Sequence, residues 1–120
     1  MTGLLLVAVG AAAGAPTRWW VDQQVQQRMT PVLPWGTFAV NLVGSFALGL
    51  LVSAGGSGSN LYLAVGVGFL GALTTFSSFG WETHRLAEDG AELMATVNVL
   101  GSVAGCLAAA ALGWWVGAAV

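Results

Sequence analysis

The sequence contains very little charge and no lysine. Of its 120 residues, 7% are charged, and the three basic residues are all arginine. A soluble domain carries about 25% charged residues, so this chain has too few to cover a water-facing surface. Three arginines also cannot build a phosphate-binding patch, which excludes nucleic acid as an expected partner.

Cysteine and clustered metal ligands are equally scarce. The single cysteine, Cys106, cannot form a disulfide within the chain. No group of His, Cys, Asp and Glu has the spacing of a metal site, and no nucleophile-base pair is visible. We therefore expect no enzyme activity.

Apolar residues make up most of the chain. They account for 57% of the sequence, and the mean hydropathy is +0.81. A membrane-spanning helix needs about 20 mostly apolar residues, and four such runs are present. The sequence predicts an all-α integral membrane protein with one four-span domain over residues 1–120. The spans are expected at about 3–20, 34–54, 61–81 and 93–118, joined by a polar connector, a Gly/Ser turn and a charged loop.

Four spans place both termini and the Gly/Ser turn on one membrane face. The three arginines, Arg18, Arg28 and Arg85, then all lie at the opposite face. Tryptophans and the tyrosine fall into two belts, one at each face, as membrane interfaces favour. The five carboxylates share the face of the arginines, so orientation is weakly encoded and insertion both ways round is compatible with the sequence.

Small residues recur at the spacing of helix contacts. The G-x-x-x-G pairs are Gly10/Gly14, Gly101/Gly105 and Gly113/Gly117. This spacing lets helix backbones approach closely in lipid, and we expect at least one pair to mark a real contact. Four helices are too few to enclose a pore comfortably, which favours an oligomer.

Polar side chains lie within the apolar spans. Thr37, Asn41 and Ser45 form one stripe at i, i+4, i+8, and Asn98 and Ser102 repeat the spacing in the last span. Such groups need partners or water in hydrocarbon. They can serve as hydrogen-bonding contacts between helices or line an ion pathway, and the residues alone leave both open.

The third span contains the stretch GALTTFSSF, residues 71–79. Paired β-branched threonines weaken a helix, and hydroxyls can bond the backbone groups that a break releases. We expect a mid-membrane break here. Beyond it, Phe76 and Phe79 would share a face, and their ring edges, the positive end of the quadrupole, could contact a small anion. The alternative is that the hydroxyls pack helices and the rings face lipid.

These motifs resemble those of the CrcB/Fluc fluoride channels. GALTTFSSF is similar to the family's usual GGLTTFSTF, and GAPTR, WGTFAVNLVGSF and the WE after the third span support the match. The resemblance covers essentially the whole chain, though the last span matches weakly. It implies a fluoride channel that exports cytoplasmic fluoride passively, built as an antiparallel, dual-topology dimer in the bacterial inner (plasma) membrane. The second subunit would be another copy or an oppositely oriented paralogue.

The resemblance also implies residue roles. Phe76 and Phe79 would contact fluoride through their ring edges, with Asn41 as the pore amide and Thr37 behind it. The carbonyls of Gly71 and Thr74 would hold a structural Na⁺ at the dimer centre. The remaining implied positions are the pore hydroxyls Ser77 and Ser78, the carried-over pair Asn98 and Ser102, the first-span Arg18 and the vestibule carboxylate Glu82.

Three positions depart from the family pattern: Ala72 replaces a Gly, Ser78 a Thr and Gly80 a common Ser. The first two are small-for-small, whereas Gly80 removes a hydroxyl. The rival interpretation is a small four-span multidrug-type cation/proton exporter. It needs an intramembrane carboxylate for coupling, and every Asp and Glu here falls in a connector or at a span end. A non-transporting membrane subunit would leave Asn41 and the hydroxyl cluster without a purpose.

Overall fold

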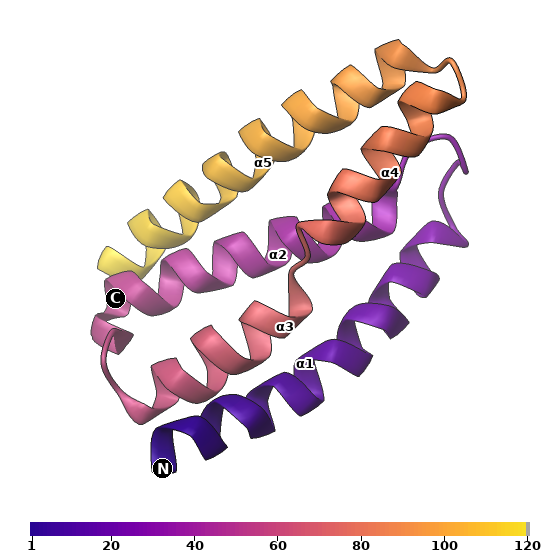
Figure 1. Cartoon of the computed structure of the whole chain (residues 1–120). Coiled ribbons are helices and arrows are strands. Elements are labelled where there is room, and N and C mark those ends of the chain that lie inside the picture. Colours follow the sequence, from indigo (N-terminus) through magenta and orange to yellow (C-terminus); the bar gives the residue numbers. More distant parts are fainter. Residues whose placement is uncertain (120) are drawn as a thin grey trace.

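The chain folds into an elongated bundle of helices. The computed structural model describes residues 1–119, and this part contains no strand. Four helical stretches are long and apolar enough to cross a membrane: Thr2–Gln26, Trp35–Gly56, Tyr62–Glu88 and Glu92–Ala118. Both termini lie at one end of the bundle, together with the turn that follows the second stretch (Figure 1). The all-helical, four-span prediction is confirmed.

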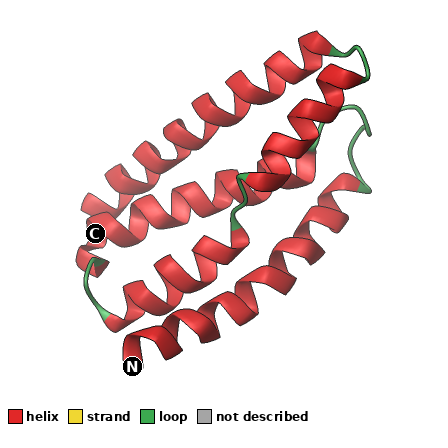
Figure 2. Ribbon diagram, in the orientation of Figure 1, coloured by secondary structure: helices red, strands yellow, loops and turns green. Residues whose placement is uncertain are grey.

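The elements follow one another with short connections. They are α1 (Thr2–Gln26), α2 (Trp35–Leu51), the π-helical η1 (Val52–Gly56) and η2 (Tyr62–Leu70), α3 (Gly71–Leu73), α4 (Ser77–Glu88) and α5 (Glu92–Ala118). η2, α3 and α4 together make the third stretch, and a loop interrupts it partway along the bundle (Figure 2).

The helices pack in two close pairs, α1 with η2 and α2 with α5. Glycine makes both pairs tight. A Cβ on Gly10 or Gly14 would collide with the backbone of η2, and one on Gly113 or Gly117 with the backbone of α2. These two G-x-x-x-G pairs are therefore true helix contacts. In the third pair, a Cβ on Gly101 would meet nothing within 4 Å in the described residues.

Two helices run further than the sequence pattern indicated. α1 continues through the polar residues to Gln26, and its Gln26 side chain then bridges the connector, donating to Leu33 O (3.2 Å) and accepting from Gly36 N (3.3 Å). The charged stretch expected as a loop is mostly helix, because α4 reaches Glu88. Its end is fixed by Gly90 at φ 78°, where a left-handed residue closes the helix.

Candidate functional site

The third stretch loses its helical conformation at Thr74–Phe76. α3 ends at Leu73, Thr74 is extended at φ −81° and ψ 156°, and helix resumes at Ser77. The Thr74 hydroxyl and amide both bond Leu70 O, each at 3.0 Å, which completes the helix before the break. The sequence predicted an interruption within residues 71–79, and the structure has one there. That the interruption lies in the middle of the membrane stays a prediction.

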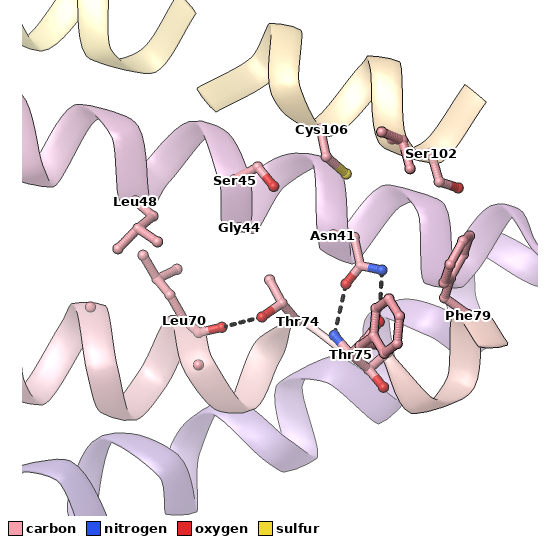
Figure 3. A pocket seen from close by; sticks show the side chains of 14 residues that line it. Asn41, Gly44, Ser45, Leu48, Leu70, Thr74, Thr75, Phe79, Ser102 and Cys106 are labelled. Atoms are coloured by element: carbon pink, nitrogen blue, oxygen red, sulfur yellow. Dashed lines mark hydrogen bonds between the residues drawn. The ribbon is translucent and has the colours of Figure 1, made fainter. Parts of the chain in front are cut away.

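Asn41 replaces the backbone hydrogen bonds that Thr75 loses at the break. Its Oδ1 accepts from Thr75 N at 2.7 Å, and its Nδ2 donates to Thr75 O at 2.9 Å (Figure 3). One side chain of α2 thus pairs both polar groups of a single extended residue. Gly44, one turn further along α2, leaves room for the Thr74 methyl group, which a Cβ at that position would hit. Two residues of α2 therefore hold the break in place: Asn41 through its hydrogen bonds and Gly44 through the space it leaves.

An open pocket of about 360 Å³ borders the break. Figure 3 shows α2, the third stretch and α5 contributing its walls. It brings together six of the residues predicted from the sequence: Asn41, Gly71, Thr74, Phe76, Phe79 and Ser102. Among residues 1–119, no carboxylate lines the pocket. Its polar groups are an amide, hydroxyls and backbone, so it offers hydrogen-bond donors without a formal charge.

Phe76 and Phe79 form one aromatic pair at the mouth of this pocket. Their ring centroids lie 5.7 Å apart with planes tilted by 46°. Phe79 is half-buried, whereas Phe76 is 84% exposed. The Phe76 ring is therefore an exposed part of the pocket wall.

The break also releases backbone carbonyls. Within residues 1–119, no hydrogen bond reaches the carbonyl of Gly71 or Thr74. Thr75 N, which would bond Gly71 O in a continuous helix, bonds Asn41 instead, and Ser78 N, which would bond Thr74 O, bonds the Thr75 hydroxyl at 3.2 Å. Free carbonyl oxygens are ligands for a hard cation such as Na⁺.

A second, smaller pocket also borders the break, at Thr75. It measures about 150 Å³ and is lined by Arg18, Trp19, Asp22, Thr37, Val40, Thr75 and Ser78. Arg18 Nε is buried and makes no hydrogen bond to the described residues. Thr37, which is 4% exposed, donates to Glu82 Oε1 at 2.8 Å. Thr37, Arg18 and Ser78 are therefore gathered here, apart from the larger pocket, and Ser77 is exposed nearby.

Asn98 and Ser102 occupy different surroundings although they share a face of α5. Asn98 is 7% exposed and donates to Thr83 Oγ1 at 2.8 Å, so it joins α5 to α4. Ser102, 8% exposed, lines the larger pocket beside Asn41. Both residues also line an apolar pocket of about 200 Å³ with Trp35.

Sequence reasoning did not single out Thr75 as a site residue. Its backbone is held by Asn41, and its hydroxyl contacts both following serines. The consecutive threonines were the available signal, but by themselves they predict only a break in the helix. Ser45 and Cys106 also line the larger pocket; the i, i+4 spacing had placed Ser45 on the Asn41 stripe.

The fold and the pocket define a multi-pass membrane protein with a mainly apolar, uncharged pocket, carrying one amide and several hydroxyls, beside an interrupted helix. Comparison with known proteins identifies its family. The chain matches the family described as "CrcB-like protein, Camphor Resistance (CrcB)" over residues 5–114, and it belongs to that family.

Its relatives carry names of ion channels. "Fluoride-specific ion channel FluC 1" of Frankia casuarinae is 51% identical over 117 residues, covering 91% of each chain. A protein of the same name from Streptomyces avermitilis is 50% identical over 114 residues, 92% of each chain. "Fluoride-specific ion channel FluC" of Citrifermentans bemidjiense is 45% identical over 111 residues, covering 89% of this chain and 90% of the relative. These names describe channels and not enzymes.

Proposed function

We propose that this protein is a fluoride channel that lets cytoplasmic fluoride leave the cell passively. The observation that carries the proposal is the pocket that joins the Phe76/Phe79 pair to Asn41 and Ser102. The names of relatives sharing about half of its sequence support the same function.

The chemistry of the pocket suits a small, strongly hydrated anion. Ring edges carry the positive end of the phenyl quadrupole, and amide and hydroxyl groups donate hydrogen bonds. Together they replace the water that an anion sheds on entry without a fixed charge that would hold it too tightly to leave. Thr37, Ser77, Ser78 and Asn98 would add polar groups to the path outside this pocket.

The channel works as an antiparallel dimer, with the interrupted helix midway through the membrane. The open pocket and the 84% exposed Phe76 support this arrangement, because a second subunit would complete the missing wall. All three arginines are accompanied by carboxylates at the same face, and this weak bias permits both orientations. The partner is a second copy or an oppositely oriented paralogue.

The same dimer would place a structural Na⁺ between the two breaks. The carbonyls of Gly71 and Thr74 fit this role, since both are released by the break and receive no hydrogen bond in the described chain. When bound, the ion would supply positive charge at the centre of the assembly. Arg18 and Glu82 would belong to the vestibule, where Glu82 fixes the Thr37 hydroxyl.

Fluoride efflux from liposomes tests the proposal. The purified protein is reconstituted into vesicles loaded with fluoride and chloride, and two ion-selective electrodes record release after the membrane potential is clamped. We expect fluoride release without chloride release. A monodisperse, well-folded protein that releases no fluoride would contradict the channel function.

The rival exporter makes a different prediction in the same vesicles. A proton-coupled cation exporter would move a lipophilic cation only when a pH gradient is imposed, and it needs a carboxylate in its binding pocket. In the described part of the chain, no carboxylate lines the pocket beside Asn41. Cation uptake driven by the gradient, with no fluoride release, would favour the exporter.

A further inference from the structure

Thr75 has no assigned role in the proposed channel, yet both its backbone and its side chain form hydrogen bonds at the break. Its backbone N–H and C=O are both paired with Asn41. Its hydroxyl lies 3.3 Å from the Ser77 and Ser78 hydroxyls and accepts the Ser78 N–H at 3.2 Å. Among the described residues it alone lines both the larger pocket and the smaller Arg18 pocket. The residue therefore stands between the two cavities.

The three contacts of the Thr75 hydroxyl fix the direction of its hydrogen bonds. A hydroxyl has one proton to donate and two lone pairs that accept. The proton goes to Ser78 Oγ, and one lone pair takes the Ser78 N–H. The other lone pair is then available to the Ser77 hydroxyl, so all three positions are used.

This arrangement determines whether the Ser78 hydroxyl acts as a hydrogen-bond donor or acceptor toward the pocket. Because Ser78 Oγ accepts the Thr75 proton, its own proton must point elsewhere, and Ser78 lines the smaller pocket with Arg18 and Thr37. A hydroxyl that accepts one hydrogen bond becomes a better donor in the next. Thr75 therefore orients Ser78 as a donor toward that pocket.

We propose that Thr75 is a positioning residue for anion transfer, orienting the Ser78 hydroxyl as a hydrogen-bond donor at the threshold between the two pockets. The inference rests on the proposed fluoride channel function and adds to it a residue that acts through its neighbour. Without the Thr75 hydroxyl, the Ser78 hydroxyl can rotate so that its oxygen lone pairs face the smaller pocket. An anion there would then be repelled by a hydrogen-bond acceptor instead of being bound by a donor.

The test is a double-mutant cycle on fluoride efflux with Thr75→Val, Ser78→Ala and the double variant. Valine keeps the branched shape and the Asn41 pairing, which uses only the backbone. We expect each single variant to slow efflux about tenfold, the size of one lost hydrogen bond. The double variant should be no slower than Ser78→Ala, because Thr75 acts through Ser78.

Two further variants separate positioning from a structural effect. Thr75→Ser keeps the hydroxyl and should restore efflux to near the wild-type rate. Thr96→Val removes an exposed hydroxyl that bonds only its own helix at Glu92 O (2.9 Å) and should conduct normally. If Thr75→Val fails to assemble, Thr75→Cys replaces it, since a thiol is a weak hydrogen-bonding group of similar size.

The outcomes distinguish this inference from the channel function. Losses that add in the double variant, or a Thr75→Val protein that conducts at the wild-type rate, would overturn the positioning role while leaving the channel intact. Additive losses are also what a simple helix-capping role for the Thr75 hydroxyl predicts. A wild-type protein that releases no fluoride would instead overturn the channel proposal itself.

Discussion

Replacing Asn41 by leucine removes both hydrogen bonds that hold Thr75 in its extended conformation. The two bonds measure 2.7 and 2.9 Å and come from one planar amide. Leucine has a similar size, so the space beside the break stays filled. The Thr75 N–H and C=O then lose their only partners in the described chain, and the segment between α3 and α4 becomes easier to open.

The expected cost follows from the number of bonds. A hydrogen bond between helices in a membrane contributes about 0.6 kcal/mol on average and up to about 1.7 kcal/mol. Two of them give about 1–3 kcal/mol, and every 1.4 kcal/mol is a factor of ten in an equilibrium constant. Opening of the break should therefore become about 5–150 times more frequent in the variant.

Hydrogen exchange measured on the detergent-solubilised protein reports this opening directly. In Asn41→Leu, the peptide containing Thr75 should exchange faster by the factor above, while peptides from α5 should keep their rates. Ser45→Ala is the matched control, because Ser45 lies one turn along the same face of α2 and has no hydrogen bond to the third stretch. Equal exchange in the two variants would refute the reasoning that the amide holds the break.

Three further predictions concern other parts of the bundle. Gly113→Val should destabilise the α2–α5 pair by roughly 2 kcal/mol or more, because its Cβ meets the backbone of α2; Gly101→Val, which faces open space, should leave the thermal midpoint unchanged. Phe79→Ile should reduce fluoride efflux at least tenfold with an unaltered gel-filtration profile, and an unaltered efflux rate would mean that the pore is misassigned. Asn98→Leu should lower the unfolding temperature modestly through the lost Thr83 bond, and a gain in stability would show that this bond contributes nothing.

The sequence indicated which side chains share a helix face, but not the groups to which they hydrogen-bond. Hydrophobic runs determine the number of spans, and the i, i+4 spacing correctly placed Thr37 and Asn41 on one face. Which groups that face would meet depends on the register between α2 and the third stretch, and no local pattern encodes it. The pairing of Asn41 with the Thr75 backbone and of Thr37 with Glu82 therefore emerged only from the structure.

The helix ends show a similar limit. Polarity alone suggested that the residues around His84 form a loop, yet helices readily continue through charged segments that lack proline and glycine. His84 and Glu88 pair at i, i+4 with 3.3 Å between nitrogen and oxygen, and the chain turns only at Gly90. Hydropathy predicts which part of a helix lies in an apolar environment. The residue at which the helix ends is determined instead by backbone propensity, here by Gly90.

The interruption of the third stretch also changes which neighbour it packs against. Before the break, η2 lies against α1; after it, α4 lies against α5 (Figure 1). During synthesis, α1 and η2 can meet as soon as both have left the ribosome, but α4 finds its main partner only after α5 has been made. A nascent chain that ends before Glu92 can form the α1–η2 pair, whereas α2 and α4 both still lack α5, the main partner of each. The larger pocket, which α5 lines through Ser102 and Cys106, is therefore completed only by the last helix that is made.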